Sequence, residues 1–447
     1  MEAAVDEAGP SPLLALRLFR PPAGAAHPLG EVPCRSAGRP LAVRPWGRPA
    51  AQEEQVKAMC LPAWPGLGLR EVLAPRAAGP LPFPLRSPDS VRGFAARYLI
   101  YHLFRALGFG EGGTVVVPDY HHGNEVRAIR AAGASIVWYR IGRDLLPDLD
   151  ELDALCRQGA RALLAIHYFG RPQPMDEIGR MCRERGILLV EDCALALLSE
   201  AGGRPLGSFG DYAVFCLYKT LPVPNGGVLV SNRGALEGLA GLGRERCGLA
   251  SVAGRSLDLA IERARSRIPI AGRAVGFAKS VAGRALSLAR VSRQTVGDSG
   301  FDLACADLGA SPLTEALLER FDYDEIRRIR RRNWALLRDR LAGRASFLDL
   351  PLGEGICPLF FPLLVPEKAA AARALWSRGV GAVEFWNRED RRSDAQTGAE
   401  ALFLRDHVLE LPIHQDISET QIDYMAEQVL RLAPLPAKVG LAVRHAS

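Results

Sequence analysis

The sequence predicts an α/β protein whose larger domain is built around a mainly parallel sheet. Between residues 114 and 193, short apolar runs of strand length alternate with segments whose apolar residues recur at three- and four-residue steps. This alternation is typical of parallel strands joined by helical crossovers. The run from Ile187 to Val190 is apolar throughout, as expected of a strand buried on both faces. Beyond about residue 320 a long helical pattern precedes mixed strands and helices, which indicates a smaller C-terminal α+β domain.

Length and composition divide the chain into three expected parts. Residues 1–80 are rich in Pro, Gly, Ala and Arg with weak periodicity, and we expect a poorly ordered extension, or one draped over the main body. Residues 81–320 should form the large domain and residues 321–447 the small one. The 56 Lys and Arg residues against 50 Asp and Glu give only a mild positive excess, so no nucleic-acid partner is expected.

Cysteine usage and the N-terminus indicate a cytoplasmic protein. The nine cysteines are scattered, with no C-x-x-C pair and no Cys/His cluster at zinc spacing, so we expect reduced thiols and no metal site. The first ten residues, MEAAVDEAGP, are acidic where a signal peptide would be basic. No apolar run reaches the length of a membrane span, so neither secretion nor a spanning segment is expected.

The periodicity also predicts the individual elements. From Ser90 onward apolar residues follow helical spacing until Gly108 ends the run. Residues 114–118 predict a strand that is followed by the loop DYHHG. Residues 312–341 predict one long helix that links the two domains. Further alternating elements are expected in EVRAIRAAGA, SIVWYRI, LDELDALC, ALLAIHYFG, MDEIGRMCRERG, ICPLFFPLLV, KAAAARALWSRG and ISETQIDYMAEQVLRLA.

The segment 244–293 is strongly basic, with eleven Lys and Arg residues against three acids. An amphipathic basic helix within 263–293 could lie on an anionic membrane surface. The alternative is a helix packed on the body with solvated arginines.

The residues that can carry chemistry lie between Leu188 and Ser231. Asp192 ends an apolar run, and open α/β sheets bind ligands at the carboxyl ends of their strands. Lys219 follows an apolar strand and precedes the pair Gly226-Gly227. A lone lysine in such a turn is usually a solvated loop residue. Together, however, the two provide what a pyridoxal phosphate (PLP) site needs: an amine that binds the cofactor covalently and a carboxylate that keeps its pyridine nitrogen protonated.

These motifs resemble the DegT/StrS-like sugar aminotransferases, which are PLP-dependent enzymes of fold type I. The resemblance implies that Lys219 binds PLP, that Asp192 pairs with the pyridine nitrogen, and that the protein is a homodimer. It also implies transfer of an amino group from a donor such as glutamate to a keto-sugar nucleotide or related keto-compound. The resemblance covers about residues 85–432 and is carried by Asp192-Cys193-Ala194, Gly210-Asp211, residues 215–219, Gly226-Gly227 and the stretches 115–134, 167–178 and 409–418.

The resemblance further assigns the remaining cofactor contacts. The phosphate turn, which in the family is of Ser-Gly-Thr type, is matched by Ala95, Ala96 and Arg97, so the hydroxyl is missing while Arg97 could supply charge. The aromatic residue that stacks on the pyridine face is matched by His122, with Tyr120 or His121 as alternatives. A pair of histidines in a loop is otherwise a surface turn.

Two further positions depart from the family pattern. Leu195 stands where the family has a glutamine that binds the phenolic oxygen, and Cys216 stands where it has a phosphate-binding serine. The lost contacts support a second hypothesis, a protein that keeps the fold but has lost catalysis and serves as a binding partner or scaffold. Retention of Lys219 together with Asp192 favours the enzyme. His167, at a strand end, is either a pocket residue or a hydrogen-bonded structural histidine.

Overall fold

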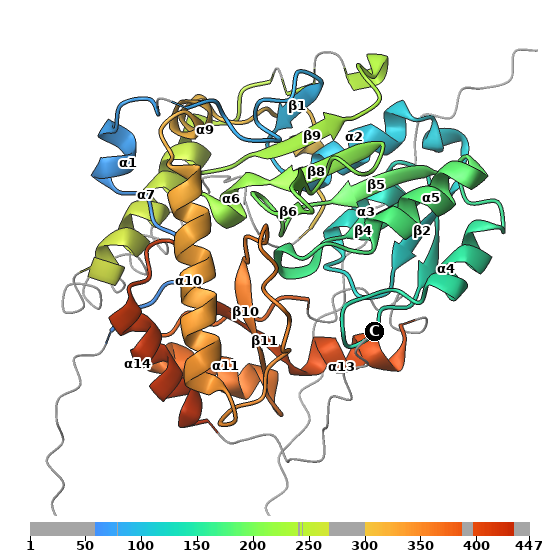
Figure 1. The fold of residues 1–447 in the computed structure, drawn as a ribbon. Coiled ribbons are helices and arrows are strands. Elements are labelled where there is room, and N and C mark those ends of the chain that lie inside the picture. The colour runs from blue at the N-terminus through green and yellow to red at the C-terminus, as the bar shows by residue number, and fades with distance from the viewer. Residues whose placement is uncertain are drawn as a thin grey trace, which may run out of the picture. The chain divides into compact units, whose positions relative to one another are not determined.

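The central element of the structure is a seven-stranded sheet in the order β1-β9-β8-β5-β4-β2-β3 (Figure 1). The structure, a computed structural model, describes residues 59–77, 79–239, 242–243, 245–267, 300–386 and 397–432. Strands β3, β2, β4, β5 and β8 run parallel, whereas β9 is antiparallel to both β8 and β1. The strands span Ser90–Gly93 (β1), Thr114–Pro118 (β2), Ser135–Tyr139 (β3), Ala162–Ile166 (β4), Leu188–Asp192 (β5), Tyr212–Cys216 (β8) and Gly227–Ser231 (β9). The predicted α/β fold with a mainly parallel sheet is confirmed.

Helical crossovers join the parallel strands and explain why the sheet is buried. The chain moves from β2 outward to β3 and then back across β2 to β4, so right-handed crossovers place the first connecting helix and the next two on opposite faces. Strands β4, β8 and β9 are accordingly buried along their whole length. The helices are α2 (Ala96–Ala106), α3 (Asn124–Ala131), α4 (Leu149–Cys156) and α5 (Met175–Arg185), with α2 packed on α3 and α4 on α5.

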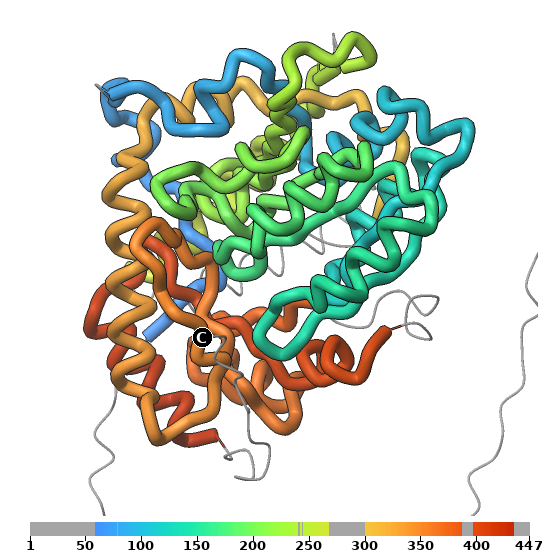
Figure 2. Tube along the Cα trace, turned by 45° about the vertical axis from the view of Figure 1, so that its right-hand side comes forward, coloured from blue at the N-terminus to red at the C-terminus, as the bar shows by residue number. Residues whose placement is uncertain are grey.

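The C-terminal part forms a smaller α+β unit around the two-stranded antiparallel sheet β10–β11. Figure 2 shows this unit, in orange and red, beside the sheet of the large domain. Helix α10 runs from α9 to α14 and so connects the two parts (Figure 1). The elements are α9 (Pro312–Leu318), α10 (Tyr323–Leu341), β10 (Phe360–Leu364), α11 (Lys368–Ser377), α13 (Ala399–His407), β11 (Val408–Pro412) and α14 (Glu419–Leu430).

Shorter elements complete the described chain. They are helices α1 (Leu69–Leu73), α6 (Leu217–Thr220) and α7 (Leu249–Arg267), the hairpin β6 (Glu200–Ala201) and β7 (Arg204–Pro205), and 3-10 turns at Phe109–Glu111, Tyr168–Gly170, Glu237–Leu239 and Leu303–Cys305.

Two expected helices differ from those observed. The helix predicted from Ser90 begins only at Ala96, because residues 90–93 pair as an edge strand with β9. The long helix predicted over 312–341 is interrupted after Leu318. Asp322 caps a new helix by accepting a hydrogen bond from the Glu325 amide (2.9 Å), and aspartate favours that position over a helix interior.

The N-terminal extension is described from Met59 onward, and this part packs against the main body. Here the structure agrees with the alternative of an extension draped over the body. Leu61 is 1% exposed, and its backbone exchanges hydrogen bonds with Gly379 and Gly381 next to the small domain. The Leu67 amide donates to the Leu259 carbonyl at 3.1 Å. Packed structure therefore starts before residue 80, while residues 1–58 lie outside the described residues.

The described part of the basic segment is helix α7, which lies on the body. Leu259 is buried, and Arg263 forms ion pairs with Glu71 and Asp416. This agrees with the interpretation of a helix packed on the body as far as Arg267. The membrane interpretation concerns 263–293, of which residues 268–293 lie outside the described residues. No helix in the described part of the chain is both long and apolar enough to span a bilayer.

Candidate active site

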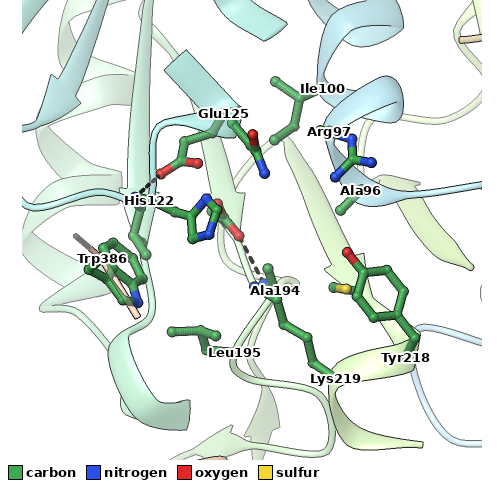
Figure 3. Close-up of a pocket in the computed structure, with 14 residues that line it drawn as sticks. Ala96, Arg97, Ile100, His122, Glu125, Ala194, Leu195, Tyr218, Lys219 and Trp386 are labelled. Atoms are coloured by element: carbon green, nitrogen blue, oxygen red, sulfur yellow. Dashed lines mark hydrogen bonds between the residues drawn. The ribbon is translucent and has the colours of Figure 1, made fainter. Parts of the chain in front are cut away.

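The structure brings all six predicted site residues to one cavity at the carboxyl ends of the central strands (Figure 3). The cavity encloses about 550 Å³ of empty space, including open solvent. Its lining includes Ala96, Arg97, His122, Asp192, Cys216 and Lys219.

Lys219 reaches this cavity because a tight turn follows β8. The single helical turn α6 carries the lysine, and the chain then returns to the start of β9. Gly226 has a φ of +130°, a conformation that side chains with a Cβ rarely adopt. A Cβ on Gly227 would come within 2.6 Å of the Ala96 amide nitrogen. The glycine pair therefore lets the lysine turn lie directly against the first residues of α2.

Asp192 is the last residue of β5 and is 7% exposed. Its Oδ1 accepts a hydrogen bond from the Ala194 amide at 2.8 Å. Burial raises the pKa of the Asp192 carboxyl above its usual range, although the Ala194 amide and the positive charge of Lys219 oppose this shift. A cationic partner in the cavity would relieve the cost of ionising this buried acid.

Of the three candidates for the stacking residue, the structure places only His122 in the cavity lining. Tyr120 instead stacks on Trp386, with ring centroids 4.9 Å apart, and His121 stacks on Trp138 at 4.9 Å. Burial, together with the positive charges of Lys219 and Arg97, lowers the pKa of His122 to about 3. The imidazole is therefore neutral at physiological pH and can offer an uncharged aromatic face.

The N-terminus of α2 lies at one end of the cavity. The helix starts at Ala96, and its N-cap residue Ala95 has no side chain that could cap the free amides. Arg97, 6% exposed, lies in the first turn and lines the cavity. Cys216 is present as predicted, but burial raises the pKa of its thiol, which leaves it a neutral and weak hydrogen-bonding group.

The lining also includes Glu125, Tyr218 and Trp386, which were not predicted from the sequence. Glu125 accepts a hydrogen bond from the His122 amide at 2.7 Å, and Tyr218 directly precedes the lysine. Trp386 reaches the cavity from the small domain with a left-handed backbone φ of +61°. Glu125 and Tyr218 lie close in sequence to His122 and Lys219, and this could have indicated that they line the cavity. No sequence motif indicates Trp386, because only the tertiary fold brings residue 386 to β5.

His167 is a structural histidine and lies outside the cavity lining. Among the described residues, His167, Glu191 and Cys193 are the one set of at least three potential metal-binding side chains (His, Cys, Asp or Glu) whose ligand atoms all lie within 4.8 Å of one another. His167 Nδ1 accepts the Gln173 amide (3.2 Å), so Nε2 carries the proton and donates to Glu191 at 2.9 Å. Glu191 also accepts two backbone amides, those of Gly207 and Gly210. These hydrogen bonds leave neither ring nitrogen of His167 with a lone pair for a metal.

The cavity residues fit PLP in their chemistry. Uncapped amides and a guanidinium at one end suit a phosphate, a buried carboxylate suits a protonated pyridine nitrogen, and a neutral imidazole suits a ring face. Lys219 is the only one of the chain's five lysines that lines this cavity among the described residues. Leu195, whose side chain offers no hydrogen bond, also lines the cavity and is 4% exposed.

The fold is that of the PLP-dependent transferases of fold type I. The model of the DegT/DnrJ/EryC1/StrS aminotransferase family matches residues 99–256 of this chain. The resemblance inferred from the motifs is thereby confirmed. The chain is 32% identical to a GDP-perosamine synthase of Vibrio cholerae over 130 residues, which are 28% of this chain and 35% of that protein.

Other relatives show the same pattern. A dTDP-4-dehydro-2,3,6-trideoxy-D-glucose 4-aminotransferase of Saccharopolyspora spinosa is 34% identical over 139 residues, 30% of this chain and 35% of that protein. The matches thus span about a third of the length of these curated relatives. Among solved structures, the aminotransferase PseC of Helicobacter pylori superposes with a TM-score of 0.60 at 14% identity, covering 83% of this chain and 98% of that one. At this identity the likeness establishes the fold.

Proposed function

We propose that this protein is a PLP-dependent aminotransferase that acts on a keto-sugar nucleotide or a related keto-compound. The observation that carries the proposal is that Lys219 and Asp192 line one cavity at the carboxyl ends of β5 and β8. The sugar aminotransferases among the relatives support the acceptor class. Glutamate as amino donor, a homodimer and a cytoplasmic location belong to the same proposal and rest on the family resemblance.

The roles of the residues follow from their positions. When bound, PLP supplies an electron sink for the charge left on the substrate carbon. The amine of Lys219 holds the cofactor and, once displaced by the donor, takes and returns the proton at that carbon. Asp192 keeps the pyridine nitrogen protonated by its opposite charge, and His122 covers the ring with a neutral face. Arg97 and the first amides of α2 hold the phosphate.

The test is amine transfer by the purified protein with PLP and glutamate. Keto-sugar nucleotides, a lipid-linked keto-sugar and a cyclic keto-compound should be compared as acceptors, with the aminated product identified by mass spectrometry. Activity on one acceptor supports the proposal. An intact fold by circular dichroism, with no cofactor absorbance band at excess PLP and no transfer, would decide for the scaffold hypothesis.

Arg97→Ala should weaken PLP binding by about 10- to 100-fold, because hydrogen bonds to charged groups contribute roughly 1.5–3 kcal/mol. The guanidinium compensates for the hydroxyl missing from the phosphate turn at residues 95–97. The dissociation constant can be measured by absorbance titration of the protein freed of cofactor. Arg105→Ala, at an exposed position near the other end of α2, is the matched control and should leave the constant unchanged. Equal affinities of the Arg97→Ala variant and the wild type would exclude this role.

A further inference from the structure

Arg330 is a buried cation whose hydrogen bonds all go to neutral oxygens. The side chain lies on α10, is 1% exposed, and is the largest fully buried side chain of the described chain. Its four donated bonds reach the carbonyls of Thr220 (3.1 Å), Leu359 (3.0 Å) and Pro358 (3.4 Å) and the Gln415 Oε1 (3.1 Å). Burying a guanidinium is costly, and burial lowers the pKa of Arg330 to about 10. Such a group is expected to have a specific task.

One of these acceptors belongs to the turn that carries the lysine. Thr220 is the last residue of α6, so its carbonyl has no partner within that single helical turn. Arg330 donates a hydrogen bond to this carbonyl, and the side-chain amide of Gln415 donates to the same oxygen at 3.1 Å. Because Arg330 also binds Gln415, the two side chains and the Thr220 carbonyl form a closed triangle of hydrogen bonds. The residue held in this way directly follows Lys219.

The remaining acceptors belong to the small domain. Pro358 and Leu359 directly precede β10, and Gln415 follows β11. The triangle therefore connects the lysine turn to both strands of the β10–β11 sheet, through a side chain of the helix that links the two domains. From the other side, the Leu217 amide donates to the Gly226 carbonyl at 3.0 Å, which fixes the beginning of the turn.

We propose that Arg330, together with Gln415, is a positioning residue for Lys219, and that it holds the lysine turn in register with the small domain. The part of this inference that concerns catalysis rests on the proposed function. The part that concerns the turn does not, since it follows from the contacts of Thr220. A guanidinium suits the task because its three nitrogens are spread over a fixed planar fork and reach Gln415, the Leu359 carbonyl and the Thr220 carbonyl, whereas the donors of an ammonium all leave one nitrogen.

The first test measures the turn itself, by hydrogen exchange in the protein without cofactor. In Gln415→Leu and Arg330→Lys, exchange of the Leu221 amide, which donates to the Leu217 carbonyl, should accelerate roughly tenfold, while amides of β2 keep their wild-type rates. Arg331→Lys is the matched control. Arg331 neighbours Arg330 on α10 and also binds carbonyls, but those of Gly353 and Ile356, away from the lysine turn.

The second test measures catalysis in the same variants. Misplacing the lysine should lower kcat about 10- to 100-fold with the KM for the donor within twofold, and Arg331→Lys should match the wild type.

Gln415→Leu keeps the test valid if Arg330→Lys fails to fold. Wild-type exchange at Leu221 in a folded Gln415→Leu variant would overturn the proposal, and so would accelerated exchange with unchanged kcat. Absence of amine transfer in the wild type would overturn the proposed function instead, while the exchange result would still decide on the turn.

Discussion

Replacing Lys219 by alanine should lower the rate of amine transfer by about 10⁴-fold, because both the covalent hold on the cofactor and the base at the substrate carbon are lost. No other lysine lines the cavity in the described part of the chain, so no second amine is available to substitute for it. The rate can be measured with the best acceptor found for the wild type. Borohydride reduction followed by peptide mass mapping should place the cofactor on Lys219 in the wild type and on no peptide of the variant.

Lys219→Arg provides the control that separates charge from chemistry. The arginine keeps the positive charge near Asp192 and the Phe385 ring, which the lysine Nζ approaches to 5.0 Å in the wild type. It cannot act as an amine at physiological pH. We therefore expect it to be as inactive as the alanine variant. A Lys219→Ala protein that keeps a tenth of the wild-type rate, or that still forms the reducible adduct, would refute the assignment.

Asp192→Asn should lower kcat/KM by roughly 10³-fold, since the charge that keeps the pyridine nitrogen protonated is removed. Without cofactor the same variant should be more stable than the wild type at neutral pH. Burial raises the folded-state pKa of Asp192 above its unfolded value, so the stability that its proton contributes is present at low pH and lost as pH rises through the raised folded pKa. The neutral amide avoids that loss. Urea unfolding between pH 4 and pH 8 measures the difference.

Adding PLP should reverse this order of stability. The bound pyridinium gives the wild-type carboxylate a partner, so ligand binding should stabilise the wild type more than the asparagine variant. Asp176→Asn, at an exposed position in the first turn of α5, serves as the control and should change neither stability nor activity. If the cofactor-free Asp192→Asn protein unfolds at the same urea concentration as the wild type across this pH range, Asp192 does not carry a buried charge at neutral pH.

The motifs sufficed to predict where the main chemical groups would lie. The apolar run before Asp192 predicts a buried central strand, and the Gly226-Gly227 pair predicts a tight turn after Lys219, so both groups could be placed at one edge of the sheet. The phosphate turn at residues 95–97 was assigned from the family resemblance, and the structure places these residues at the start of α2. Short-range periodicity failed where a different interaction decided the structure. Residues 90–93 became a strand because β9 offers them a partner, and Asp322 capped a new helix where one continuous helix was expected.

What the sequence by itself determined is the order of strands and helices along the chain and the placement of Lys219 and Asp192 at one edge of the sheet. Buried strands and glycine turns leave local patterns that can be read along the chain. Only the tertiary structure decided which of Tyr120, His121 and His122 faces the cavity, since three adjacent loop side chains have no periodicity to distinguish them. It also decided that Trp386 lines the cavity and that Arg330 donates a hydrogen bond to the carbonyl of Thr220, the residue after Lys219. These contacts join residues more than a hundred positions apart, and such pairs are set by how the two domains pack rather than by any local preference.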